Sequence, residues 1–403
     1  MWALAAFLLL FQTVDYNAEG RKALEAQDYA AAVRHFTQAA AADPQDYAAR
    51  FHMALAKSFL NQDEEAIQDY RKVLELKPGL YQAELNLGIL LLRRKHPEEA
   101  VAPLEKAVEA KPAEYRPRYY LAEALLAAGE LPRAAEHYTA ALGINPKSAE
   151  AELGIARALA RQNRLTDAVP HFVKAAALDP NFQDVLLELA GLYEKAGERT
   201  EAIAIYQSFP NNVAAQERLG QLLIEGKQYA EAIPRLEEAF QKEATPTNRL
   251  ALASAYIFNK QPEKALPLLE QSVAAEGANY DVRMMYARAL RDAKRYMPAA
   301  QQFLEAAKLK PDSPAAWKDL AAMLYLVENY PQSLAALDRA HKLGDDSPAN
   351  HYFRAITLDR MRDLPGALAS YQKFLSMSEG KNPDEEFKAR QRARIIQKEL
   401  SKR

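Results

Sequence analysis

Residues 81–114, YQAELNLGILLLRRKHPEEAVAPLEKAVEAKPAE, contain the pattern that decides the fold. The small residues Gly88 and Ala100 lie in this stretch, followed by a bulky Leu104 and, near the end, by Pro112. Because four residues are close to one helical turn, Ala100 and Leu104 share one face of a helix. Pro112 lacks a backbone donor and ends that helix. The stretch therefore predicts two helices that cross closely where their residues are small.

The same pattern recurs with a period of 34 residues. The period is marked by a proline that recurs in register at Pro44, Pro78, Pro112, Pro146, Pro180 and later at Pro311. When this proline is numbered 32, the first unit begins at Thr13 and eleven units can be counted. Position 8 is Gly or Ala in all of them, position 20 is Ala or Ser, and position 24 is Phe, Tyr or Leu. Turn signals near position 15, such as Gly129 and Gly197, separate the two helices of a unit.

These positions resemble those of tetratricopeptide repeat (TPR) proteins, whose unit is a 34-residue helix-turn-helix. The resemblance extends over residues 13–381. It implies an all-α, right-handed superhelical TPR solenoid of about eleven repeats, which presents a concave binding face. We expect six units in residues 13–212 and five in 213–381, preceded by an apolar segment at 1–12 and followed by a basic amphipathic capping helix at 382–403.

The sixth unit departs from the period. It covers only residues 183–212, because the next small residue at position 8, Gly220, comes four residues early. A deletion of about one helical turn shortens the second helix without rotating its buried face. Two interpretations stay open, a tolerated deletion and a bend that divides six units from five.

Composition excludes several classes of function. The chain has 403 residues and no Cys, with 52 Lys and Arg against 54 Asp and Glu. Without Cys there are no disulfides, thiolate metal sites or cysteine nucleophiles. A formal charge of -2 argues against nucleic acid as the partner, because such binding requires a concentrated basic surface.

The N-terminus is apolar from Trp2 to Phe11, which is too short to cross a bilayer. The first basic residue is Arg21, and no clear small-residue cleavage site follows the apolar run. Three interpretations compete: a degenerate export signal, a partial anchor, and a strip that packs on the first repeat. We favour export or anchoring, which predicts a periplasmic or envelope-associated protein with possible membrane association through this segment; a cytoplasmic location is the alternative.

The C-terminal helix is basic. Its start is marked by Asn382-Pro383, and Phe387, Ile395 and Ile396 provide apolar positions among many Lys and Arg residues. Repeat arrays need a terminal helix with a polar outer face. We therefore expect a cap at this end rather than a site for anionic lipid or nucleic acid.

Catalytic signatures are absent from the sequence, so we expect no enzyme, no catalytic residues, no cofactor and no metal. No phosphate-binding loop, zinc-protease helix or nucleophile elbow is present, and the repeats occupy nearly the whole chain. His35, His137 and His171 share position 23 of their units, but equivalent helices of neighbouring repeats lie on the order of 10 Å apart, too far for common metal ligation. We expect these histidines to lie exposed on helix surfaces.

A concave face in TPR proteins is lined by the first helix of each unit, at positions 2, 5, 6 and 9. The Lys and Asn residues of the carboxylate clamp found in chaperone-binding members are missing at those positions here, and so is a run of Asn at position 6. What remains is a mixed apolar and aromatic surface. The residues we expect to bind a partner are Phe51, Leu55, Leu85, Asn86, Ile89, Arg116, Tyr119, Tyr120, Tyr352 and Phe353.

The sequence thus predicts a non-catalytic, monomeric scaffold. It would bind peptide or helical segments of partner proteins on its concave face, in bacterial envelope assembly or secretion. The alternative is a structural or assembly subunit that acts through self-association or through docking on its convex face. The sequence does not identify the partner.

Overall fold

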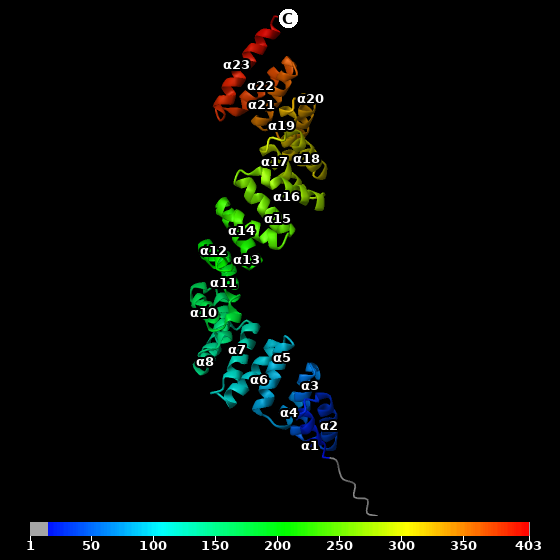
Figure 1. Ribbon diagram of the computed structural model, residues 1–403, viewed down its shortest axis with the longest axis vertical. Helices are drawn as coiled ribbons and strands as arrows, with labels where there is room; N and C mark the ends of the chain where they lie inside the picture. The colour runs from blue at the N-terminus through cyan, green and yellow to red at the C-terminus, as the bar shows by residue number, and fades with distance from the viewer. Residues whose placement is uncertain (1–14, 403) are drawn as a thin grey trace, which may run out of the picture. The chain divides into compact units, whose positions relative to one another are not determined.

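The computed structural model describes residues 15–402, and the apolar segment expected at residues 1–12 lies outside them. Within the described part, all regular structure is helical, with 23 α-helices and one short 3-10 helix (Figure 1). None of these helices has the length and apolar character needed to cross a bilayer. The described residues form two compact units, which divide between Ile205 and Tyr206. The division of the repeats after residue 212 stays a prediction.

Helix pairs follow one another along the first unit. Its helices are α1 (Tyr16–Glu25), α2 (Tyr29–Ala42), α3 (Tyr47–Phe59), α4 (Asp63–Leu76), α5 (Tyr81–Arg93), α6 (Pro97–Ala110), α7 (Tyr115–Ala128), α8 (Leu131–Ile144), α9 (Ala149–Arg161), α10 (Leu165–Leu178), η1 (Pro180–Phe182) and α11 (Val185–Ala196). The next helix, α12 (Arg199–Gln207), contains the boundary between the units.

The second unit continues the same alternation and ends on an unpaired helix. Its helices are α13 (Val213–Glu225), α14 (Tyr229–Lys242), α15 (Pro246–Phe258), α16 (Pro262–Ala275), α17 (Tyr280–Asp292), α18 (Tyr296–Leu309), α19 (Pro314–Leu326), α20 (Tyr330–Lys342), α21 (Pro348–Arg360), α22 (Leu364–Ser378) and α23 (Pro383–Leu400). The chain is therefore an all-α solenoid of helix pairs, as the sequence predicts.

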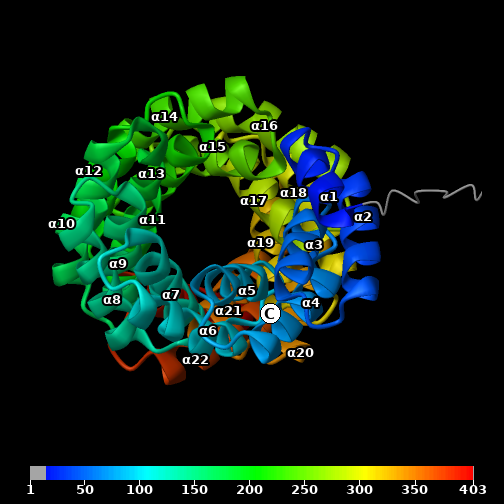
Figure 2. The ribbon, with the colours of Figure 1, turned by 90° about the horizontal axis from the view of Figure 1, so that it is seen from below.

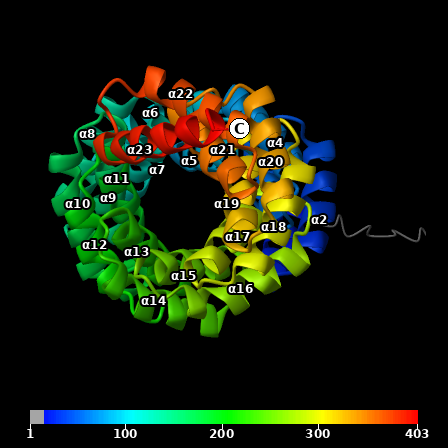
Figure 3. The same cartoon turned by 90° about the horizontal axis from the view of Figure 1, so that it is seen from above.

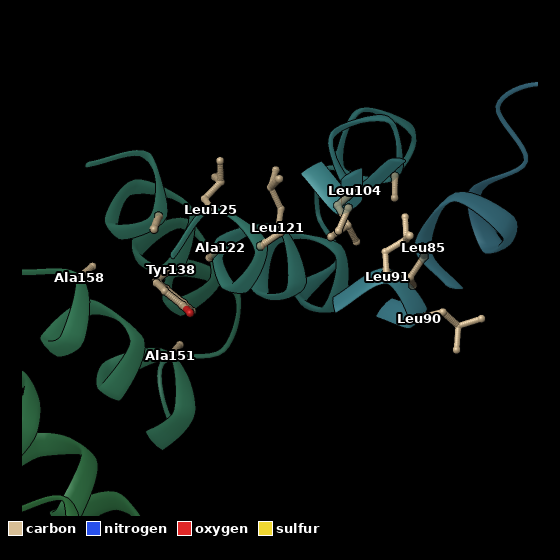
Figure 4. Packing of buried hydrophobic residues seen from close by; sticks show 14 of the residues in the cluster. Leu85, Leu90, Leu91, Leu104, Leu121, Ala122, Leu125, Tyr138, Ala151 and Ala158 are labelled. Carbon is tan, nitrogen blue, oxygen red and sulfur yellow. The ribbon is translucent and has the colours of Figure 1, made fainter. Parts of the chain in front are cut away.

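Small and bulky residues pack together inside every repeat. All residues at positions 8 and 20 are buried, and the bulky residue at position 24 is at most 7% exposed in every unit. Ser333, the polar member of position 20, donates a hydrogen bond of 2.8 Å to the carbonyl of Ala321 at position 8. Figure 4 shows part of this core in the first unit, with Leu104 and Tyr138 at position 24.

The turn between the two helices of a unit has the same backbone geometry throughout. The residue at position 15 has a positive φ in all eleven units, from 58° at Asn61 to 85° at Gly129. Only Gly129 and Gly197 are glycines at this position; the others are Lys, Asn, Gln, Glu and Arg. A non-glycine residue in this conformation costs roughly 1–2 kcal/mol, so the packing of the helices must outweigh that cost.

The shortened sixth repeat has a short second helix, as the deletion predicts. Helix α12 has 9 residues, whereas α10 has 14. On the second unit's side, Gln216 is buried and donates hydrogen bonds to the carbonyls of Tyr206 and Phe209, at 3.2 and 3.1 Å. The side chain of Asn212 accepts from the backbone of Ala215 and caps α13. These bonds satisfy polar groups that the missing turn would otherwise leave unpaired.

Helix α23 covers the end of the array. Ala389, Ala393 and Ile396 are buried against Tyr371 and Phe374. The apolar face expected from sequence is correct at Ile396 but wrong at Phe387 and Ile395, which are 64% and 48% exposed. Alanines form most of the buried face because α23 lies close to α22.

The contact between positions 8 and 24 can be tested with two glycines. A Cβ at Gly88 would lie 2.7 Å from Leu104 Cδ2, whereas nothing lies within 4 Å of a Cβ at Gly191, inside α11. We expect Gly88→Ala to destabilise the protein by roughly 1–3 kcal/mol through overpacking. Gly191→Ala should stabilise it by about 0.5–1 kcal/mol, since Ala is the better helix former. Thermal unfolding followed by circular dichroism measures both; stabilisation by Gly88→Ala would contradict the packing argument.

Candidate functional site

The first helix of each repeat lies on the inner side of the curve in both units. In the first unit, α5, α7 and α9 are on this side and α6, α8 and α10 are outside (Figure 2). In the second unit, α13, α15, α17 and α19 are inside and α14, α16 and α18 outside (Figure 3). The residues proposed from sequence lie on inner helices of different units, so we describe them as two surfaces.

The first surface is formed by aromatic residues of α3 and α7, which we call the inner aromatic row: Phe51, Tyr119 and Tyr120. All three are half-buried. The Phe51 ring meets the buried Tyr70 edge-on at 5.7 Å between centroids. Tyr119 contacts Tyr120 at 5.3 Å, and burial raises the pKa of the Tyr119 hydroxyl. Each ring therefore packs on the core with one side and leaves the other for a partner.

The remaining residues proposed in the first unit differ in exposure. Leu85 is only 5% exposed and belongs to the core, so it does not lie on the open surface. Leu55 and Ile89 are half-buried. Asn86 donates a hydrogen bond of 3.1 Å to the Tyr70 hydroxyl. Arg116 is exposed, with its guanidinium 6.0 Å from the centre of the Tyr120 ring.

The second surface contains Tyr352 and Phe353 on α21. The Tyr352 ring lies 4.9 Å from Phe374, and Phe353 lies 5.2 Å from Tyr325 on α19. Both residues are half-buried. Tyr352, but not Phe353, lines a hollow of about 580 Å³ that sequence reasoning did not predict. We call it the C-terminal hollow, and its lining residues are Tyr325, Tyr352, Ile356, Asp359, Arg360, Arg362, Tyr371, Lys388 and Arg392.

Positive charge dominates the C-terminal hollow, since four of its lining residues are cations and one is a carboxylate. Arg392 donates two hydrogen bonds to Asp359, at 2.6 and 2.8 Å, and this fixes α23 to α21. Within residues 15–402, no carboxylate lies within 4.0 Å of the charged groups of Arg360, Arg362 or Lys388. These three exposed cations are therefore available to an anionic group of a partner.

The histidines at position 23 behave differently from one another. His35, His137 and His171 are all half-buried, so the expectation that they lie exposed on helix surfaces is wrong. His171 Nδ1 lies 2.6 Å from Oε2 of Glu152, a carboxylate on α9 that is completely buried. Burial lowers the pKa of His137, since desolvation disfavours the charged imidazole.

Glu84 and Glu152 occupy the same position 4 of their repeats but have different partners. Lys174 and His171 both contact the buried carboxylate of Glu152. Glu84 is equally buried, yet its only cation among the described residues is Lys106, at 3.8 Å, because position 23 of its unit is Pro103. Burial accordingly raises the pKa of Glu84, and Lys106 offsets this only in part.

Removal of the charge should change the stability of the fold in opposite directions at Glu84 and Glu152. A raised pKa means that Glu84 favours the fold when protonated, and that this contribution is lost as pH rises through its folded-state pKa. We expect Glu84→Gln to raise the melting temperature at pH 7–8 and to have no effect in acid where Glu84 is protonated. Glu152→Gln should cost about 1–3 kcal/mol at pH 7, since it removes the buried carboxylate charge that Lys174 and His171 contact. Melting curves at both pH values test this, and stabilisation by both variants would contradict it.

Comparison with known proteins agrees with the repeated helix pairs of the fold. Two models described as tetratricopeptide repeat match residues 17–81 and 85–149, and residues 159–223 and 256–324. The chain belongs to the tetratricopeptide repeat family. Folds of this family are typically non-catalytic and present surfaces for protein–protein interaction.

Individual relatives match over part of the chain. The Vi polysaccharide export protein VexE of Salmonella typhi is 38% identical over 104 residues, which are 26% of this chain and 14% of that protein. The chain thus matches a small part of the length of this curated relative. A MamA structure from AMB-1 shares 27% identity and covers 42% of this chain and 99% of that one, with a TM-score of 0.40. MamA from Desulfovibrio magneticus RS-1 shares 25% identity over 41% of this chain and 94% of that one, with a TM-score of 0.39.

Proposed function

We propose that the protein is a non-catalytic, monomeric scaffold that binds peptide or helical segments of partner proteins on its inner helices. The C-terminal hollow is the observation that carries this proposal, because three exposed cations without carboxylate partners stand there beside half-buried tyrosines. The hollow would take acidic side chains of the bound segment. Guanidinium groups bind carboxylates through paired hydrogen bonds, and aromatic rings contribute apolar contact area.

The inner aromatic row of the first unit provides a second contact surface of the same kind. Phe51, Tyr119 and Tyr120 are rigid because each packs on the core, so little side-chain entropy is lost when a partner covers them. This packing also affects how the row can be tested. Tyr119 contacts the buried Tyr138 at 6.0 Å, so its replacement by Ala would lower stability as well as binding. The cations of the C-terminal hollow are exposed, so their replacement should change binding with little effect on stability.

The test uses a fluorescein-labelled twelve-residue peptide of alternating Glu and Leu and measures fluorescence polarisation with the full chain. We expect Arg360→Glu combined with Lys388→Glu to weaken binding about tenfold or more, the equivalent of roughly 1.4 kcal/mol. The affinity of the unaltered protein should fall as salt rises, because exposed charges are screened.

The matched control is Arg394→Glu combined with Lys398→Glu, which makes the same charge change on exposed residues of α23 outside the hollow. This control should bind the peptide nearly as well as the unaltered protein. An equal loss in both variants would show attraction by net charge alone, and no loss in the first variant would remove the hollow from the proposal.

The alternative function, docking on the outer side or self-association, is favoured by one feature of the second unit. An apolar groove of about 510 Å³ is lined by residues of α18, α19 and α20, including Met297, Leu304, Trp317 and Leu324. Exposed apolar grooves are found where proteins dock. Sedimentation velocity over a hundredfold concentration range tests self-association, since a monomer at every concentration would argue against it.

We propose further that the scaffold works in bacterial envelope assembly or secretion. The partial match to a polysaccharide export protein and the apolar sequence Trp2–Phe11 support this location, while a cytoplasmic location is the alternative. Export predicts that the protein recovered from fractionated native cells has lost about the first 12–17 residues, and an anchor predicts an intact chain in the membrane fraction. Intact-mass measurement decides between them; an intact chain in the soluble fraction would contradict the envelope location.

A further inference from the structure

The joint between α20 and α21 carries two histidines and a carboxylate that lie close together. His341 is in the last turn of α20, Asp346 is in the connection, and His351 is in the first turn of α21. His351 Nε2 lies 2.6 Å and His341 Nδ1 3.5 Å from the same oxygen, Oδ1 of Asp346. One ligand atom from each of the three side chains lies within 4.8 Å of the other two, and residues 15–402 contain no other such group of His and carboxylate side chains.

We propose that His341, Asp346 and His351 bind a divalent transition-metal ion of the Zn²⁺ type, with water completing the coordination. Imidazole and carboxylate together suit Zn²⁺ and its neighbours in the first transition row, whereas Mg²⁺ and Ca²⁺ prefer oxygen ligands alone. This site is independent of the protein-binding function proposed above.

The distances suit such an ion after small side-chain rotations. Ligand atoms about 2.0–2.2 Å from a tetrahedral Zn²⁺ lie roughly 3.3 Å from one another. The contact of His341 with Asp346 is already close to this spacing, and the hydrogen bond between His351 and Asp346 has to lengthen by less than 1 Å. The two imidazole rings are 5.7 Å apart between centroids, which leaves room for an ion between their nitrogen atoms.

The backbone of the joint holds the three ligands in place before any ion arrives. The amide of Gly344 donates to the carbonyl of His341 at 2.9 Å, and that of Asp346 donates to Gly344 at 3.0 Å. The neighbouring carboxylate, Asp345, accepts a hydrogen bond from Asn350 at 3.2 Å and lies 3.4 Å from Lys318. These bonds fix the turn, so metal binding requires little ordering of the chain.

Burial and charge around the site determine its access to solvent and its affinity for cations. The side chain of His351 is 13% exposed, whereas those of His341 and Asp346 are 47% and 55% exposed, so the fourth coordination position faces solvent. Lys342, Arg354 and Lys373 line the adjoining hollow, and Arg354 is paired with Asp338. The two lysines lower the affinity for any cation, so selectivity has to come from the nitrogen ligands.

Metal binding would tie the last two repeats together. Position 32 of the tenth unit is Asp345 instead of Pro, and α20 has 13 residues where α18 has 14. The connection there is therefore set by side chains and not by a proline. An ion held by both helices would stabilise this joint, since ligands that bind only the folded state raise its stability.

The test titrates tag-free full-length protein with ZnCl₂ by calorimetry and with CoCl₂ by visible absorption, which reports nitrogen and oxygen ligation directly. We expect one ion per chain, no binding of MgCl₂, and a higher melting temperature with ZnCl₂. Each ligand is replaced in turn, by His351→Ala, His341→Ala and Asp346→Asn. Each variant should weaken Zn²⁺ binding by more than roughly 10–100-fold, which is the loss caused by removing a residue that only hydrogen-bonds to a metal ligand. Circular dichroism checks folding, and His351→Gln replaces His351→Ala if that variant unfolds.

The control is His96→Ala. His96 is half exposed and lies 3.5 Å from Glu99, so it forms a similar histidine–carboxylate pair without a third ligand nearby. This variant should bind Zn²⁺ like the unaltered protein. The proposal would be overturned if the protein does not bind Zn²⁺, or if changes at His341, Asp346 and His351 leave the Zn²⁺ affinity unaltered. An equal loss of Zn²⁺ affinity in His96→Ala would overturn it as well.

Discussion

The packing of a bulky residue at position 24 against a small residue at position 8 is the constraint on which the structure depends. Leu104 fills the space that Gly88 leaves, and Leu236 does the same at Gly220. Because the helices of a unit approach so closely, the chain between them has to reverse within a few residues. That reversal requires a left-handed residue at position 15, which all eleven units have.

The fold could be predicted from the sequence because its core residues recur in register. Gly and Ala at position 8 predict close helix packing, and all of these residues are buried. The left-handed turn was visible only at Gly129 and Gly197, since Lys95 or Glu328 carries no such signal. At those positions the tertiary contacts overrule local preference. The face of α23 was harder to predict, because the buried Ala389 and Ala393 are less conspicuous than Phe387.

The candidate sites were only partly predictable, since position within a repeat does not determine exposure. Phe51, Leu85 and Tyr119 all occupy position 5, yet Leu85 lies within the core, while the longer aromatic rings reach the surface. The C-terminal hollow was missed because its cations come from α21, the following turn and α23, which are distant in sequence. The group of His341, Asp346 and His351 has no counterpart at equivalent repeat positions, because its members come from the end of α20, the connection and the start of α21.

Both C-terminal sites lie where the repeat pattern is broken. In a regular repeat, positions 8, 20, 24 and 32 are committed to packing and helix ends, and the next unit covers the exposed face. The eleventh unit is followed by α23, which covers that face and adds Lys388 and Arg392 to the C-terminal hollow. At the preceding joint, Asp345 stands where the regular units have proline, and Asp346 follows it between His341 and His351. Residues that the period does not fix are free to carry chemistry, so partner and metal specificity should be sought at such interruptions.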